Sequence, residues 1–191
     1  MSSRGGLAAP ARSTPPAVAP APLAPGSPYR ICCVCWGNIC RSPMAEVVLR
    51  DRLEVAGLGG RVVLDSAGTS DEEVGRPAHP ATRRVLRHHG LEADGHVARE
   101  FEAGWVRRYD LLLAMDDGHA RTLRRHARDG AADPDRVRLL TSFAVTGPAA
   151  ELAEEGIEDP WGRPDDAFET VFGLVSDSVD GLVPALAAVL A

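Results

Sequence analysis

The sequence contains 191 residues, 45% of them hydrophobic and 25% charged, with a formal net charge of −6. This length and composition are enough to bury the core of one ordinary domain. The negative charge disfavours a nucleic-acid binder that depends on a broad basic face, and no uninterrupted apolar stretch approaches the roughly 20 residues of a bilayer span. We therefore expect one globular domain with neither nucleic acid nor membrane as a partner.

The first 28 residues differ in composition from the rest of the chain. Seven of the fifteen prolines lie there, together with two arginines and no acidic residue. The segment lacks apolar periodicity and has too little apolar surface to offset the entropy of ordering it. We expect residues 1–28 to form a disordered Ala/Pro-rich tail and residues 29–191 to form the domain. The prolines also interrupt any apolar core of a secretory signal.

All four cysteines fall within nine residues of one another. A disulfide framework would need cysteines in distant loops, so the cluster indicates a reducing compartment and local chemistry. Together with the missing secretory signal, this predicts a cytoplasmic protein. The cysteines are Cys32, Cys33, Cys35 and Cys40.

After the tail, β-prone apolar runs alternate with segments of helical periodicity. The first run is typical of a strand buried on both faces, and Ser42-Pro43 suits the start of the helix after it. Asp166 and Glu169 resemble a capping box at the start of the last helix. Such alternation predicts an α/β domain with a parallel sheet, whose ligand site lies beyond the carboxyl ends of the strands. The expected strands are 30–35, 61–66, 109–115 and 137–141, and the expected helices begin near residues 42, 80 and 166.

The loop after the first strand carries a distinctive set of residues. Cys35 ends the strand, and Arg41 follows where the helix begins. The amides from Gly37 to Arg41 lie near a helix N-terminus, which suits a phosphate group and favours the thiolate form of a cysteine. The planar guanidinium of Arg41 can bind two phosphoryl oxygens, and the hydroxyl of Ser42 can donate to the thiolate. A small buried cysteine is the alternative reading, which this constellation disfavours.

The segment VCWGNICRSPMAE, residues 34–46, closely resembles the V-C-x-G-N-I-C-R-S-P-x-A-E signature of the low-molecular-weight protein tyrosine phosphatases. The resemblance is to the bacterial type and covers residues 30–190. It implies a flavodoxin-like, doubly wound fold with four parallel strands in the order 2-1-3-4 and helices on both faces. Further matching segments, in the order of the family, are 64–69, 96–99, 109–116 and 158–161.

The resemblance implies a protein-tyrosine phosphatase that acts on phosphotyrosine and small aryl phosphates. Cys35 corresponds to the nucleophile that forms a cysteinyl-phosphate, Arg41 to the phosphate clamp and Asp159 to the general acid and base. Without the resemblance, Asp159-Pro160 would be read as a turn. No metal or cofactor is expected. The implied partners are phosphotyrosine proteins, and we expect a monomer with at most weak self-association.

Supporting roles follow from the same resemblance. The side chain of Asn38 fixes the loop and is linked to Ser66 and His96, while Cys40 can form a reversible disulfide with Cys35 that protects the nucleophile. For these positions a strand end, a surface histidine and a packed thiol are the structural alternatives. Cys32 and Cys33 are expected in the core. The phosphate-binding and supporting residues are Trp36, Gly37, Asn38, Ile39, Cys40, Ser42, Ser66 and His96.

The aromatic walls of the substrate pocket depart from the family pattern. Glu72 stands where many members have Tyr or Trp, and Gly162 follows Trp161 where vertebrate-type members have a second aromatic residue. Trp36 can restore an aromatic face to the pocket or narrow its mouth. A carboxylate at Glu72 favours basic residues beside the phosphotyrosine. The expected pocket residues are thus Trp36, Glu72 and Trp161.

Three alternatives to a tyrosine phosphatase stay open. A protein-arginine phosphatase on the same scaffold fits the Asp-Pro-Trp-Gly segment, although its known members tend to have threonine where this chain has Ile39. An arsenate reductase would need further cysteines downstream, and none follows Cys40. A silent phosphate-binding module would need neither a thiolate nor an acid, so Cys35 and Asp159 argue against it.

Overall fold

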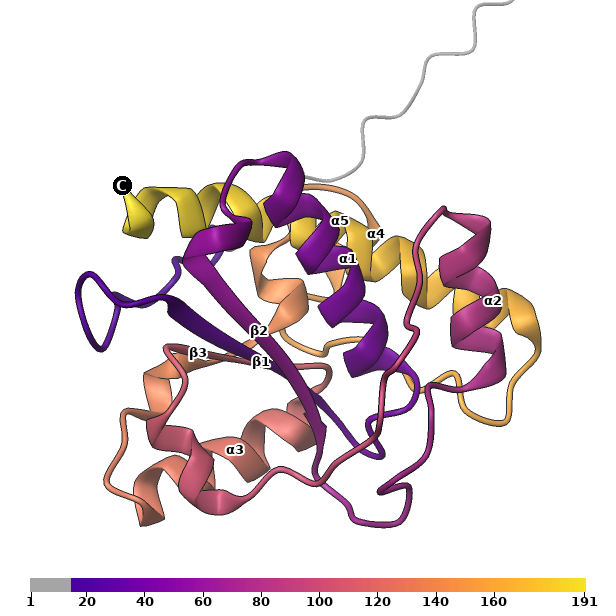
Figure 1. The fold of residues 1–191 in the computed structure, drawn as a ribbon, viewed down its shortest axis with the longest axis horizontal. Coiled ribbons are helices and arrows are strands. Elements are labelled where there is room, and N and C mark those ends of the chain that lie inside the picture. The colour runs from indigo at the N-terminus through magenta and orange to yellow at the C-terminus, as the bar shows by residue number, and fades with distance from the viewer. Residues whose placement is uncertain (1–14) are drawn as a thin grey trace, which may run out of the picture.

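The computed structural model describes residues 15–191 of the chain (Figure 1). Its centre is a four-stranded sheet in which every neighbouring pair of strands is parallel, in the order β2-β1-β3-β4. The central strand β1 pairs Ile31 with Leu64 on one side and with Leu111 on the other. The predicted sheet and its strand order are therefore confirmed. The strands are β1 (Tyr29–Cys35), β2 (Val62–Gly68), β3 (Leu111–Ala114) and β4 (Val137–Leu139).

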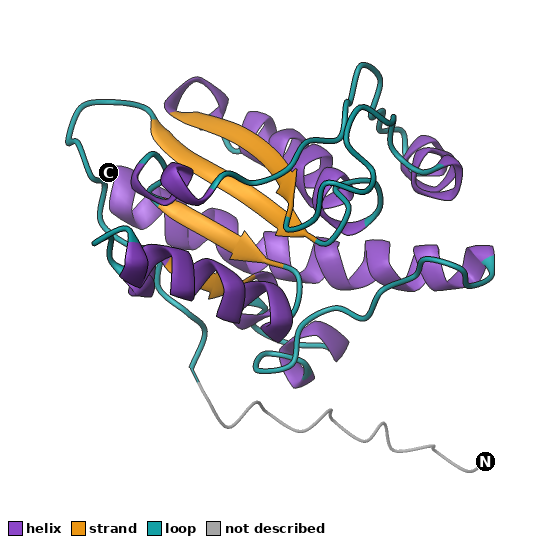
Figure 2. Cartoon of the chain, turned by 90° about the horizontal axis from the view of Figure 1, so that it is seen from below, coloured by secondary structure: helices purple, strands orange, loops and turns teal. Residues whose placement is uncertain are grey.

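Helices cover both faces of the sheet, as Figure 2 shows from below. One layer contains α1 and α5, which pack against each other, with α2 against α5 at its edge; α3 covers the opposite face (Figure 1). The α-helices are α1 (Arg41–Val55), α2 (Pro80–His88), α3 (Asp117–Asp129), α4 (Pro148–Glu151) and α5 (Asp165–Leu190). Short 3-10 helices span Gly59–Arg61, Ala103–Arg107, Pro134–Arg136 and Leu140–Phe143.

Strand β1 is buried on both faces because its side chains alternate between the two layers. Ile31 and Cys33 belong to the core under α1 and α5, whereas Cys32 and Val34 belong to the core under α3. Alternation along a strand that is covered on both sides explains why its sequence is a continuous apolar run. The expected core positions of Cys32 and Cys33 are confirmed, since both side chains are fully buried.

Two expected helix caps are wrong, although both helices begin within one residue of the expected start. Helix α1 begins at Arg41 with Cys40 as its N-cap, and the Ser42 side chain points into the preceding loop instead of capping the helix. The N-cap of α5 is Pro164, so Asp166 and Glu169 form no capping box there. Ser42 contacts Cys35 in the loop instead, and Glu169 contacts two histidines at the end of α2.

Residues 15–28 belong to the segment that the composition predicts to be a disordered tail. They form no helix or strand, yet they lie along the domain: the backbone N–H of Ala17 donates to Ser142 O at 2.9 Å, and Arg136 donates to Ala21 O at 3.0 Å. Tyr29 donates its hydroxyl to Pro20 O at 2.9 Å. Polar groups of the domain thus hold a segment with little apolar surface of its own. The rest of the expected tail, residues 1–14, lies outside the described residues.

Among the described residues, α5 is long and apolar enough to cross a membrane by length and composition alone. Its buried residues recur at helical spacing and pack against α1 in the larger core. Its other face carries the carboxylates of Asp177 and Asp180. This amphipathic arrangement is that of a helix that covers a sheet, and we assign α5 to the core.

Candidate active site

The loop between β1 and α1 lies at the carboxyl edge of the sheet and is held from several sides. Thr69 and Ser70 donate their backbone N–H groups to Cys35 O and Trp36 O at 2.8 and 3.0 Å. Gly68 allows this close approach, because a Cβ atom there would lie 2.5 Å from Trp36 O. On the other side, His79 N donates to Ile39 O at 2.8 Å. The loop is therefore clamped between β2 and the start of α2.

Cys35 and Ser42 face each other across this loop. The Cys35 Sγ and Ser42 Oγ atoms lie 3.0 Å apart, and both residues are buried. Ser42 Oγ also accepts a hydrogen bond from Asn38 Nδ2 at 2.9 Å. Asn38 thus donates to Ser42 and does not compete for the serine proton, which can go to the sulfur at 3.0 Å or to Ala67 O at 3.4 Å. The expected donation from Ser42 to a Cys35 thiolate fits this geometry.

Asn38 is the central support of the loop. Its backbone has a φ of 56°, a left-handed conformation that asparagine adopts more readily than most residues. Its side chain donates to Ser66 Oγ at 3.0 Å and accepts from Arg99 N at 3.0 Å, and its carbonyl oxygen lies 2.7 Å from His96 Nε2. The structure thus brings together the predicted group of Asn38, Ser66 and His96. Arg99, which also donates from Nε to Ser66 O, is a member that sequence reasoning missed.

The guanidinium of Arg41 is buried at the foot of the same cavity. Nη1 donates to Asp116 Oδ2 at 2.8 Å and to Ile157 O at 2.9 Å, and Nη2 donates to Asp159 Oδ2 at 2.5 Å. Nε is buried without a hydrogen-bond partner among the described residues. The edge formed by Nε and Nη2 is therefore the part of Arg41 that can bind two oxygens of a phosphoryl group once Asp159 moves aside.

Asp116 is a functional candidate that the sequence did not single out. It caps the N-terminus of α3, because its Oδ1 accepts from His119 N at 3.0 Å, and the His119 ring lies 2.7 Å from the same oxygen. Burial by itself would raise the pKa of Asp116, but the contacts with His119 and the charge of Arg41 outweigh it and hold the pKa well below its ordinary range. Asp116 therefore stays ionised beside Arg41.

A cavity of about 260 Å³ opens over Cys35 and Arg41. Trp36 and Trp161 stand at its walls with 43% and 64% of their surface exposed, and Glu72 lines it, as the sequence predicts. Glu73 is a further lining residue that the sequence analysis missed, and it forms an ion pair with Arg76 at 3.1 Å. The cavity thus offers an anion-binding floor, two exposed indole rings and an acidic side.

The other thiols have the character of packed cysteines. Burial, followed by the nearby Cys35 and Asp159, raises the pKa of Cys40 to about 12. Burial also raises the pKa values of Cys32 and Cys33 well above the ordinary value. All four cysteines are free. Cys40 lines the same cavity as Cys35. The two thiols therefore differ in the groups that surround each sulfur and not in their access to the cavity.

Comparisons with known proteins agree with this geometry. The family model described as "Low molecular weight phosphotyrosine protein phosphatase" matches residues 30–190. A low molecular weight protein-tyrosine-phosphatase from Streptomyces coelicolor is 46% identical over 161 residues, which are 83% of this chain and 93% of the relative. Low molecular weight protein-tyrosine phosphatase A from Mycobacterium bovis is 39% identical over 155 residues, which are 81% of this chain and 90% of the relative. The crystal structure of YfkJ from Bacillus subtilis superposes with a TM-score of 0.76 at 32% identity, covering 86% of this chain and 98% of that one.

Proposed function

Because the chain belongs to the low molecular weight phosphotyrosine protein phosphatase family, it is a protein-tyrosine phosphatase, and we propose that Cys35, Arg41 and Asp159 perform the hydrolysis. The observation that carries this assignment is their convergence. The three residues come from two distant parts of the sequence and line one cavity. A thiol, a guanidinium and a carboxylic acid are together what hydrolysis of an aryl phosphate requires.

In the first step, the Cys35 sulfur attacks the phosphorus of phosphotyrosine. An S–P bond forms while the P–O bond to the tyrosine ring breaks, and Asp159 gives its proton to the leaving phenolate oxygen. The loop amides and the Nε–Nη2 edge of Arg41 receive the equatorial oxygens, where charge develops in the transition state. Asp159 is half exposed at the cavity and accepts from Trp161 N at 3.1 Å, so its carboxyl group lies at the wall of the cavity that would receive the leaving group.

In the second step, water hydrolyses the cysteinyl-phosphate. Asp159, now ionised, takes a proton from the water as its oxygen attacks phosphorus, and the S–P bond breaks to release phosphate and the Cys35 thiolate. Ser42 donates to the departing sulfur across the 3.0 Å contact, which stabilises it as a leaving group. The cycle consumes one water and yields tyrosine and phosphate.

The substrates are phosphoproteins, and the cavity suits a flat aromatic phosphoester. Trp36 and Trp161 provide exposed ring faces for the phosphotyrosine ring. Glu72 and Glu73 favour basic residues beside it. We further propose a cytoplasmic location, since four free cysteines suit a reducing compartment. We also propose reversible protection of Cys35 by Cys40, which lines the same cavity.

Two phosphopeptides of the same sequence test the substrate class, one carrying phosphotyrosine and one phosphoarginine. Under reducing conditions we expect kcat/KM to be at least about tenfold higher for phosphotyrosine. Preference for phosphoarginine would favour the alternative suggested by Gly162 and would overturn the proposed substrate pocket. The Cys35→Ser variant serves as the control, because it keeps the cavity and loses the nucleophile; turnover by this variant would contradict the assignment of Cys35.

A further inference from the structure

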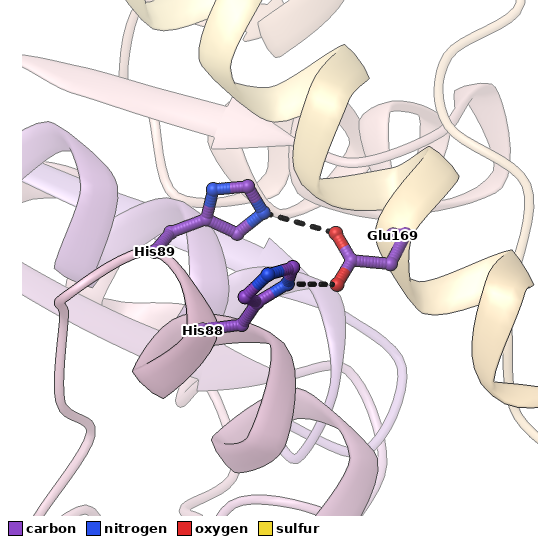
Figure 3. Close-up of side chains that lie close together, drawn as sticks. All are labelled: His88, His89 and Glu169. Carbon is purple, nitrogen blue, oxygen red and sulfur yellow. Dashed lines mark hydrogen bonds and ion pairs between the residues drawn. The ribbon is translucent and has the colours of Figure 1, made fainter.

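A second cluster of chemically versatile side chains lies away from the active site, where the end of α2 meets the second turn of α5. His88 Nδ1 lies 3.1 Å from Glu169 Oε1, and His89 Nε2 lies 2.9 Å from Glu169 Oε2. Figure 3 shows the two imidazole rings turned toward the two oxygens of one carboxylate. One ligand atom from each residue can be chosen so that all three lie within 4.8 Å of one another.

The two elements that carry this cluster are fixed relative to each other. The His89 ring stacks on Phe172 of α5 with a centroid distance of 3.8 Å and an interplanar angle of 11°. Arg84 and Asp165 form a bidentate ion pair between the same helices. The position of His89 opposite Glu169 is therefore set by packing and not by the cluster alone, which lowers the entropy that a ligand would have to remove.

The donor set is one that divalent transition metals and zinc favour. Two imidazole nitrogens and one carboxylate are a known zinc ligand set, with metal–ligand distances of about 2.0–2.2 Å. A tetrahedral ion would place its ligand atoms about 3.4 Å apart. Each Glu169 oxygen lies within about 0.5 Å of this spacing from one imidazole nitrogen. The three ligand atoms together spread over as much as 4.8 Å, so the ion requires an inward movement of His88, whose side chain is 76% exposed.

We propose that His88, His89 and Glu169 form a surface Zn²⁺ site that bridges α2 and α5. On binding, the proton that each facing nitrogen donates to Glu169 leaves, or moves to the other nitrogen of the same ring, so that both facing nitrogens present lone pairs. Water fills the remaining coordination position on the exposed side. The C-terminal end of α2 adds its negative dipole end to the attraction for a cation. Hard cations such as Mg²⁺ and Ca²⁺ prefer oxygen ligands and bind weakly here.

Zinc at this site stabilises the domain and leaves the chemistry at Cys35 unchanged. The cavity over Cys35 is lined by none of the three ligands. A metal that binds only the folded chain raises its Tm by about 5–10 °C at a hundredfold excess over the Kd, for a protein of this size. The proposed zinc site is independent of the phosphatase function, because zinc should also bind the Cys35→Ser protein, which lacks the proposed nucleophile.

Calorimetric titration with ZnCl2 tests the site in the Cys35→Ser protein, where the active-site thiolate cannot bind zinc. We expect one ion per chain with a Kd of about 10 µM or tighter, and a Kd at least tenfold weaker for His88→Gln and for Glu169→Gln in the same background. His126→Gln is the matched control, since it removes an imidazole from α3 on the opposite face of the sheet and should leave the Kd unchanged.

A rise in Tm with zinc that both ligand variants lose, and that Mg²⁺ does not produce, would support the proposal. Binding that is absent at 100 µM Zn²⁺ would overturn it. Equal binding by the ligand variants and the His126→Gln control would also overturn it, because the ion would then be held elsewhere. Without metal, the Tm of each variant is expected to match that of the parent. The same substitutions made in the chain that keeps Cys35 are expected to leave its hydrolysis of an aryl phosphate unchanged. These two controls distinguish a loss of zinc binding from misfolding.

Discussion

Asp159 accepts a hydrogen bond from Arg41 Nη2 at 2.5 Å, so the proposed general acid occupies the guanidinium edge that must bind the substrate phosphoryl group. Asp116 holds the other nitrogen, Nη1, at 2.8 Å from the opposite side. The two carboxylates therefore have different relationships to the reaction. In the proposed mechanism, substrate has to displace Asp159 from Arg41, whereas Asp116 can keep its contact with Arg41.

Replacing Asp159 with alanine removes both the acid and the competitor for Arg41. We expect kcat to fall by about 10²–10⁴ for substrates with poor leaving groups and much less for those with good ones, because only poor leaving groups need the proton. The Ki of inorganic phosphate should decrease, since no carboxylate has to be displaced. Steady-state rates over a series of aryl phosphates, with phosphate as competitive inhibitor, measure both effects.

Glu158→Ala is the matched control, because Glu158 precedes Asp159 in the same loop and pairs with Arg163 instead of Arg41. Its rates and phosphate affinity should stay near those of the parent. An equal loss of kcat for good and poor leaving groups in Asp159→Ala would contradict the assignment of Asp159 as the acid.

The Ser42 hydroxyl, 3.0 Å from the Cys35 sulfur, should matter most when the sulfur leaves phosphorus. In Ser42→Ala we expect hydrolysis of the cysteinyl-phosphate to slow by about 10–100-fold, the value of one hydrogen bond to a charged group. A burst of released phenol before the steady state, measured by stopped flow, would report accumulation of the intermediate. A variant that loses rate without a larger burst would place the role of Ser42 before the S–P bond forms.

Asp116 links the stability of the protein to pH. Its pKa in the folded chain lies well below the ordinary value of 3.8, so its ionised form stabilises the fold above about pH 4, and this contribution is lost as the pH falls below that value. Asp116→Asn should therefore lower the free energy of unfolding by about 1–2 kcal/mol at pH 7, where a charged hydrogen bond is lost beside the buried Arg41. Urea unfolding at pH 7, 5 and 3 measures the difference.

The gap between the Asp116→Asn variant and its parent is expected to begin narrowing below about pH 4, because the unfolded parent then binds a proton at Asp116 that the folded parent still excludes. Asp117→Asn provides a control on the same helix, since Asp117 contacts Arg121 on the surface and not Arg41. A gap that stays constant with pH would show that Asp116 acts through shape and not through its charge.

Local patterns in the sequence predict most of this fold and the floor of the active site. The alternating runs predict the parallel sheet, and the unbroken segment from Cys35 to Ser42 places the proposed nucleophile and the proposed phosphate clamp in one loop. No local pattern predicts the role of Asp116, because its partner Arg41 is 75 positions away in the sequence. The same reason hides the cluster around Glu169, whose histidines lie about 80 positions earlier and meet it only when α2 packs on α5.

Chemical labelling separates the proposed nucleophile from the thiol beside it. Cys40 lines the same cavity as Cys35, but burial raises the pKa of Cys40 to about 12, so at pH 7.5 it stays protonated and reacts slowly with an alkylating agent. We expect brief treatment with iodoacetamide to modify Cys35 alone, and inorganic phosphate to slow the reaction by covering the loop. Peptide mass spectrometry identifies the site, and urea-unfolded protein, in which all four cysteines should react, serves as the control. Modification of Cys40 at a rate equal to that of Cys35 in the folded protein would show that access to the cavity, and not the loop around Cys35, sets thiol reactivity.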